Sequence, residues 1–183
     1  MQLYSLLVAL VLGAIVVGDG LYETARVDRA WPQRPDIIQP DKGGINRKFF
    51  WGPAQGLFEL ALLVAAWLTW PTAASRIWVI VAVAIHFATR AWSFAYFIPA
   101  AIRFEAGTAD SADGAKIKRW VSLSPWRVLL EAVAISALAM LLFVWWPSAF
   151  SARVIHHFLR TVSSKPHMQP DARMKTVGVA HPS

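Results

Sequence analysis

The stretch "RIWVIVAVAIHFATRAWSFAYFIPA", residues 76–100, is long and apolar, yet it carries a histidine and an arginine in its middle. About 20 mostly apolar residues are enough to cross the hydrocarbon core of a bilayer as a helix. His86 and Arg90 stand four residues apart, so they share one face of that helix. Ionisable side chains are costly inside a membrane, and they indicate a function or a specific ion pair there. The interaction partners of His86 and Arg90 are therefore important for both the fold and the function.

Three further stretches have a similar length and composition, and they occupy residues 3–21, 53–70 and 125–146. The whole chain is 56% hydrophobic and only 16% charged, which is too apolar for a soluble domain of 183 residues. The sequence therefore predicts an all-α integral membrane protein. We expect a four-helix bundle with transmembrane spans at about residues 3–21, 53–70, 76–100 and 125–146, forming one domain over residues 1–147.

Prolines and tryptophans mark the ends of these spans. Pro53 and Pro125 suit the first turn of a helix, whereas Pro71, Pro99 and Pro147 fall where helices should stop. Tryptophans near the span ends are typical of an aromatic belt at the membrane interface, and they are Trp51, Trp70, Trp78, Trp126, Trp145 and Trp146. No basic residue precedes the first span and no clear cleavage site follows it, so we expect a retained helix rather than a signal peptide.

The expected connections are unequal in length. A long polar loop covers residues 19–52, a tight turn residues 71–75, and a third loop residues 101–124. A polar, basic tail follows at residues 148–183, and it begins with a segment suited to a short interfacial helix. Four spans place both termini on one side. A plain count of Lys and Arg favours the loops on the cytoplasmic side, but carboxylates offset the loop charges and not those of the tail. We therefore expect the termini to be cytoplasmic.

Composition also narrows the classes of function. The chain has no cysteine, which excludes disulfides, thiolate metal sites, haem attachment through CxxCH and a cysteine nucleophile. Its net charge of +7 lies mostly in loops and the tail, without a basic helix or an RNA-binding motif. No nucleic-acid partner is therefore expected. Membrane lipid, with its anionic headgroups, is the expected partner of these charges.

Polar residues fall in the same half of every span, the half that faces the long loop, when depth is counted at about 1.5 Å per residue. Three pairs have the i,i+4 spacing that places both members on one helix face: Gln55/Glu59, His86/Arg90 and Arg127/Glu131. A four-helix bundle can turn such faces inward and build a ligand site between them. The predicted lining residues are Tyr22, Glu23, Gln55, Glu59, His86, Arg90, Tyr96, Arg127 and Glu131.

This pattern has three interpretations. In the first, the residues line a pocket for a hydrophobic or aromatic small molecule, and His86, Glu59 and Glu131 are the candidate catalytic groups for proton transfer. In the second, the arginines only neutralise the carboxylates and so hold the helices together. In the third, Glu23, Glu59, Glu131 and His86 converge on a metal. The ExxH pairs of diiron bundles are missing and the spans contain one histidine, so no metal and no cofactor is predicted.

Four segments together resemble small bacterial four-helix membrane proteins of the anthrone oxygenase-like group, most of which are uncharacterised. They are "GLYETARVDRAW" (20–31), "FFWGPAQGL" (49–57), "SFAYFIPAAIRFE" (93–105) and "AKIKRWVSLSPWRVLLEA" (115–132). The resemblance covers residues 3–146. It implies a four-helix bundle in the bacterial cytoplasmic membrane and, through a few relatives, cofactor-independent oxygenation of anthrone-type polycyclic aromatics. It carries no agreed catalytic set onto this chain.

We therefore expect an integral membrane protein with a polar intramembrane pocket for a hydrophobic or aromatic small molecule, with oxygenase-like chemistry among its candidate reactions. The alternative is a non-catalytic accessory or structural subunit of a larger membrane complex that contacts lipid, pigment or quinone. An enzyme predicts a connected, inward polar cluster with an opening, whereas a subunit predicts satisfied ion pairs and no cavity. Both are compatible with a homo-oligomer or a larger complex.

Overall fold

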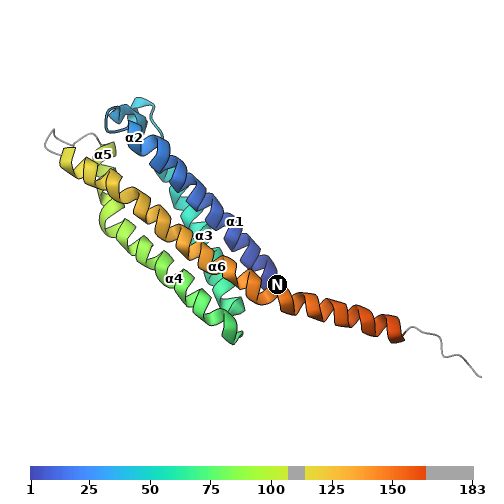
Figure 1. The fold of residues 1–183 in the computed structure, drawn as a ribbon. Helices are drawn as coiled ribbons and strands as arrows, with labels where there is room; N and C mark the ends of the chain where they lie inside the picture. Colours follow the sequence, from blue (N-terminus) through green and yellow to red (C-terminus); the bar gives the residue numbers. More distant parts are fainter. Residues whose placement is uncertain (107–113, 164–183) are drawn as a thin grey trace, which may run out of the picture. The chain divides into compact units, whose positions relative to one another are not determined.

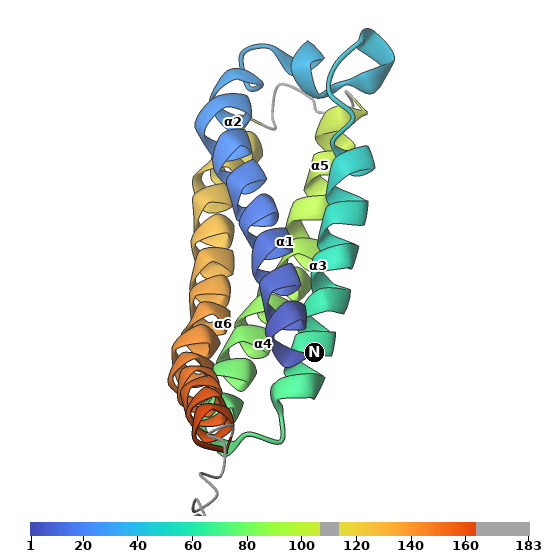
Figure 2. The same cartoon turned by 90° about the vertical axis from the view of Figure 1, so that its right-hand side faces the viewer.

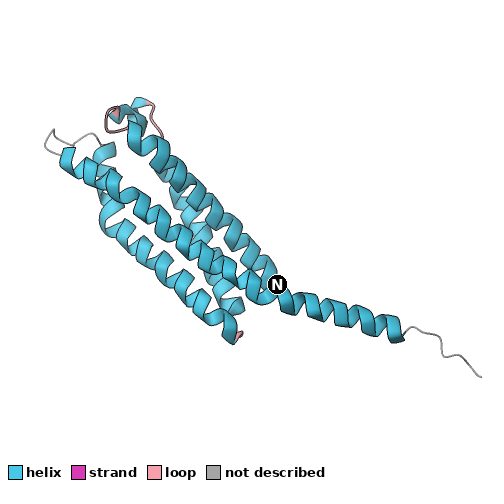
Figure 3. Cartoon of the chain, in the orientation of Figure 1, coloured by secondary structure: helices cyan, strands magenta, loops and turns pink. Residues whose placement is uncertain are grey.

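The computed structural model describes residues 1–106 and 114–163, with side chains up to Val144. This part of the chain is 90% helical and contains no strand (Figure 3). The chain divides into two compact units, Met1–Trp146 and Pro147–Ser183. The packing described below is that of the first unit. Residues 164–183 of the expected tail lie outside the described residues, and an interfacial position of its beginning stays a prediction.

Four long helical segments lie side by side in the first unit (Figures 1 and 2). The first contains α1 (Gln2–Tyr22), the π-helical turn η1 (Glu23–Val27) and α2 (Asp28–Ala30), and the second is α3 (Arg47–Thr69). The third contains α4 (Ala73–Trp92), the π-helical turn η4 (Ser93–Phe97) and α5 (Ile98–Glu105). The fourth is α6 (Gly114–Ser163), of which residues 114–146 belong to the first unit. All four are long and apolar enough to cross a membrane, which confirms that part of the prediction.

The predicted ends of several helices are wrong. The first segment continues past residue 21 to Ala30, and α3 begins at Arg47 rather than at Pro53. The fourth begins at Gly114 rather than at Pro125, and neither Pro99 nor Pro147 ends its helix. A proline inside a helix removes one backbone hydrogen bond and clashes with the preceding turn. Here that cost is offset, because the residues beyond each proline of the first unit bury side chains in the bundle, as Trp120 does at 2% exposure.

The connections are correspondingly shorter than predicted. The long loop covers residues 31–46 rather than 19–52, and it contains two short 3-10 helices, η2 (Pro35–Ile38) and η3 (Pro40–Lys42). Gly44 is required in this loop, because a Cβ there would lie 2.2 Å from the carbonyl oxygen of Asp36. Arg34 donates a hydrogen bond to Asp36, and this bond holds the pKa of the Asp36 carboxyl below its usual value.

The two ends of the unit are fixed by different contacts. At one end the side-chain amide of Gln2 donates to the carbonyl oxygen of Leu68 at 2.7 Å, so the chain start lies beside the turn between α3 and α4. That turn is tight, as predicted, because α3 ends at Thr69 and α4 begins at Ala73. At the other end Trp31 packs against the rings of Phe104 and Trp120, with centroids 5.3 and 5.9 Å away.

The buried core has two apolar clusters with a polar layer between them. The cluster near the α3–α4 turn is built mainly from Leu, Ala and Val and includes Val16, Phe58 and Ala82. The cluster near the loops is rich in aromatic residues and includes Trp31 and Phe97. Along α4 and α6, the buried residues between these clusters include the polar His86, Thr89, Ser124 and Glu131. The two apolar clusters therefore fix the depth of the layer.

The outer surface of the four helices is apolar. Only 22–33% of the residues in each span's most apolar window are buried inside the protein. The exposed side chains include Leu60, Trp67, Ile77, Leu129 and Phe143. A soluble monomer rarely exposes so large an apolar surface, and hydrocarbon is a solvent that would accommodate it.

Candidate functional site

His86 is the centre of the polar layer. It lies on α4 with 0% exposure, and its Nδ1 is 2.9 Å from Oε2 of Glu131 on α6. Its other ring nitrogen, Nε2, has no hydrogen-bond partner among the described residues, and Oε1 of Glu59 on α3 lies 3.7 Å away. The edge-to-face rings of Phe58 and Phe87, with centroids 4.9 and 5.4 Å away, restrict the imidazole. A histidine between two carboxylates is thus held in place from several sides.

The Glu59 carboxylate is shared with an arginine. Nε of Arg90 donates a hydrogen bond to Oε1 of Glu59, the same oxygen that faces His86. The Arg90 guanidinium also lies over the ring of Phe94, 4.7 Å from its centroid. Glu131, His86, Glu59 and Arg90 therefore form a continuous row across three helices, which we call the polar network. It brings together residues that the sequence placed at one depth.

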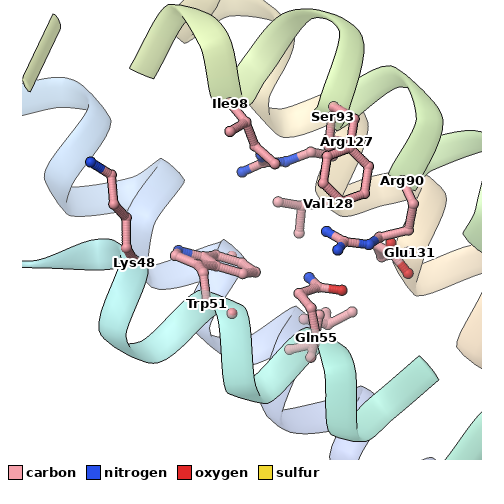
Figure 4. A pocket seen from close by; sticks show the side chains of 14 residues that line it. Lys48, Trp51, Gln55, Arg90, Ser93, Ile98, Arg127, Val128 and Glu131 are labelled. Atoms are coloured by element: carbon pink, nitrogen blue, oxygen red, sulfur yellow. The ribbon is translucent and has the colours of Figure 1, made fainter. Parts of the chain in front are cut away.

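A cavity of about 330 Å³ lies against this network (Figure 4). Its volume is within the range of small-molecule sites. Its polar lining residues include Gln55, Arg90, Arg127 and Glu131, which come from three helices. The other lining residues are Val16, Val17, Gly20, Lys48, Trp51, Gly52, Ser93, Phe94, Ile98 and Val128. Apolar walls with a few convergent polar groups are typical of sites for hydrophobic ligands.

Arg127 contributes an unpaired cation to the cavity. Its guanidinium carbon lies 4.7 Å from the ring centroid of Phe97 and 5.5 Å from that of Trp51. In the described part of the chain, no carboxylate comes within ion-pair distance of it. Arginine stacks well on aromatic rings, but a stacked guanidinium keeps its N–H donors. These donors are available to a ligand.

The predicted lining residues separate into three groups. Gln55, Arg90, Arg127 and Glu131 line the cavity, while Glu59 and His86 contact that lining from behind. Glu23 lies in an adjoining hollow of about 110 Å³, which Arg127 also lines. Tyr22 and Tyr96 line neither space. Tyr22 is 59% exposed, and Tyr96 packs against Phe97 and Arg119.

The sequence interpretation missed several side chains around the cavity. Trp51 was assigned to the aromatic belt, but it lines the cavity and stacks on Arg127. Arg47 was assigned to a loop, but it is buried and bonds to Glu105 at 3.2 Å. The sequence did contain a signal, because Arg47, Trp51, Gln55 and Glu59 repeat at four-residue intervals across Pro53.

A second buried acid, Asp28, lies nearer the loops. It has 0% exposure, and neither carboxylate oxygen has a hydrogen-bond partner among the described residues. The charged groups that act on it are Glu23, Arg47 and Arg127. A buried polar group without a partner is costly, and Arg47 and Arg127 reduce that cost at longer range.

The arrangement points to proton exchange and anion binding. No group of three His, Cys, Asp or Glu side chains in the described ranges is placed to hold a metal ion. The polar network instead combines one titratable ring, two carboxylates and a paired cation, with a further cation across the cavity.

Comparison of the chain with protein-family models, with curated proteins and with solved structures finds no match.

Proposed function

We propose that the chain is an integral membrane protein and that its cavity binds a hydrophobic or aromatic small molecule from the bilayer. The observation that carries this proposal is the cavity itself, because it adjoins the polar network between two apolar clusters. Its apolar walls suit the body of such a molecule. Arg90, Arg127, Gln55 and Glu131 suit its polar end.

An accessory subunit would need the charges only as braces. Arg90 and Glu59 fit that role, because they satisfy each other. Arg127 does not fit it, since its guanidinium has no carboxylate at contact distance among the described residues and faces an open cavity. An unpaired cation at this depth is expensive, and a ligand that supplies its counter-charge would account for it. This favours a binding function over a purely structural one.

The resemblance to the anthrone oxygenase-like group adds two proposals. The first is location in a bacterial cytoplasmic membrane, with both termini cytoplasmic. The second is an oxygenase-like reaction on an aromatic ligand, for which His86, Glu59 and Glu131 would supply proton transfer. The network supports the second proposal because His86 and Glu131 share a hydrogen bond of 2.9 Å beside the cavity.

A larger side chain that fills the cavity should weaken ligand binding. Val17 lines the cavity, whereas Ile15 lies on the same helix with an exposed side chain that does not line it. Binding of 1-methoxy-4-nitronaphthalene, a neutral aromatic probe, would be measured by calorimetry on the detergent-purified chain. Val17→Phe should weaken binding by about tenfold or more, equivalent to about 1.4 kcal/mol, and Ile15→Phe should not. Equal affinities in both variants and wild type would contradict the proposal.

A further inference from the structure

The charged side chains around the cavity restrict the chemical class of the ligand. The polar network contains two carboxylates, Glu59 and Glu131, and only one arginine, Arg90, so a carboxylate is placed to accept a proton from a ligand. Across the cavity, Arg127 has no carboxylate at ion-pair distance among the described residues, so its N–H donors can bind an anion. A neutral molecule that separates into a proton and an anion supplies both. Such a molecule can also cross hydrocarbon, since it arrives without charge.

We infer, on the basis of the proposed function, that the cavity takes up a lipophilic phenol-type weak acid and ionises it between Glu131 and Arg127. Glu131 is the proton acceptor, because its side chain lines the cavity and bonds to His86 at the same time. The O–H bond of the ligand breaks, its electron pair stays on the oxygen, and the proton bonds to a carboxylate oxygen of Glu131. No oxidant or other reactant is needed.

The rest of the network positions the proton acceptor. His86 lies between the carboxylates of Glu131 and Glu59, and its ring nitrogens are 2.9 and 3.7 Å from their oxygens. Arg90 fixes Glu59 from the other side, so in this ionisation step Glu59 and Arg90 act as positioning residues. The network thus becomes neutral when the ligand becomes an anion.

The phenolate would be stabilised by Arg127. The guanidinium carbon lies 5.5 Å from the ring centroid of Trp51 and 4.7 Å from that of Phe97, and such stacking leaves N–H donors for an oxyanion. The other charged groups that act on Arg127 are Glu23, Asp28 and Arg47, besides Glu131. Lys48 also lines the cavity, but its ammonium bonds to Glu105 at 2.9 Å. Unlike Lys48, Arg127 has no carboxylate in contact among the described residues, so it is the cation that can pair with the anionic oxygen of the ligand.

A chromogenic phenol tests the inference directly. The probe is 4-nitro-1-naphthol, whose anion absorbs visible light where its acid does not, and its methyl ether serves as the probe that cannot ionise. The purified full chain is titrated at a pH one unit below the pKa of the free probe, where about a tenth of the free probe is ionised. Wild type is expected to convert most of the bound probe to the anion.

The variants separate ionisation from binding, because the methyl ether reports how much binding each one retains. Glu131→Gln and His86→Asn should lower the anion fraction of the bound probe to that of free solution, and Arg127→Gln should also lower it. Ser136→Ala, on the same helix but exposed to the outside, should keep the wild-type fraction. If Glu131→Gln does not fold, Glu131→Asp should give an intermediate fraction, because it draws the carboxylate away from His86.

Three results would overturn the inference. Wild type could bind the phenol as its acid, in which case the ligand site stands and the ionisation does not. Glu131→Gln could keep the full anion fraction, in which case Glu131 does not accept the proton. If neither the phenol nor its ether binds, the proposed function fails together with the inference.

Discussion

At the scale of single residues, the central question is why apolar helices carry charges, and the structure gives two answers. Arg90 is neutralised by Glu59, so its presence does not by itself require a ligand. Arg127 lies at the other wall of the cavity without such a partner in the described chain. Two arginines that look alike in the sequence thus have different environments, and only Arg90 has a carboxylate at contact distance in the described chain.

The first prediction concerns the Arg90–Glu59 pair. Glu59→Leu alone leaves the Arg90 guanidinium without its partner, so it should lower the free energy of unfolding by about 1–3 kcal/mol. Arg90→Leu should do the same to the carboxylate. The double variant Glu59→Leu/Arg90→Leu should lose less than the sum, because neither unpaired charge remains. The measurement is reversible unfolding in mixed micelles, and purely additive losses would show that the pair is not coupled.

The sequence could predict which residues share the polar layer, but not which way each one faces. Depth follows from position along a helix of known rise, and for Glu59, His86, Arg90 and Glu131 it identified residues that do meet. The direction of a side chain depends on which face of the helix it occupies. The buried face of α1 contains Val16 and Gly20, so Tyr22 points outward although its depth is suitable.

At the scale of helices, the errors of the sequence interpretation share one cause. Helix ends were placed at prolines, but at Pro53 and Pro125 the pattern of inward residues continues across the proline. Tertiary packing outweighs the loss of one backbone bond there, as the buried ion pair between Arg47 and Glu105 illustrates. Counting the periodicity before assigning the ends would have moved both starts toward the loops.

The second prediction concerns how closely the helices pack. A Cβ at Gly13 would lie 2.9 Å from Ile135 on α6 and 3.0 Å from Phe58 on α3, so α1 approaches both helices there. At Gly18, on the same helix, no described atom lies within 4 Å of that position. Gly13→Ala should destabilise the protein by about 1–3 kcal/mol through overpacking. Gly18→Ala should be neutral or stabilising by up to about 1 kcal/mol, because alanine favours helix.

Thermal unfolding of both glycine variants in the same detergent checks this prediction. The two substitutions add the same methyl group to the same helix, so their difference isolates the contact of α1 with α3 and α6. A midpoint for Gly13→Ala at or above that of Gly18→Ala would mean that the helices can separate there at no cost.

At the scale of the whole molecule, the absence of cysteine makes the membrane proposal easy to test. Asp41 lies in the loop of residues 31–46, and Thr72 lies in the turn between α3 and α4, at the opposite end of the four helices. Single variants Asp41→Cys and Thr72→Cys would each carry the one thiol of the chain. A membrane-impermeant maleimide applied to intact cells should label Asp41→Cys and not Thr72→Cys, since the termini and this turn are proposed to be cytoplasmic.

Lysed cells provide the control for these labels, because both thiols should then react. Labelling of Thr72→Cys alone in intact cells would reverse the orientation while keeping the four spans. Equal labelling of both in intact cells would contradict a bundle that crosses the membrane.

The walls of the cavity differ in a way that suggests how a ligand reaches it. The residues contributed by α1 and α6 are mostly buried, including Val16, Val128 and Glu131. The wall between α3 and the η4–α5 segment is open: Phe94 is 60% exposed, and no described atom lies within 4 Å of a Cβ added at Gly52. This side faces outward at the depth of the helices, so a ligand dissolved in the bilayer would enter between α3 and η4 without passing through water.

Gly52 and Gly56 offer a matched test of this lateral route. Both are exposed glycines on α3 with open space where a Cβ would be, but only Gly52 lines the cavity. Gly52→Phe should place a ring in the opening and slow association of the neutral naphthalene probe by about tenfold or more, as expected when binding first requires a rearrangement. Gly56→Phe, one turn along, should associate at the wild-type rate in stopped-flow measurements on nanodisc-embedded protein. If Gly52→Phe also associates at that rate, the ligand must enter from the loop end instead, where the hollow lined by Glu23 and Arg47 adjoins the cavity at Arg127.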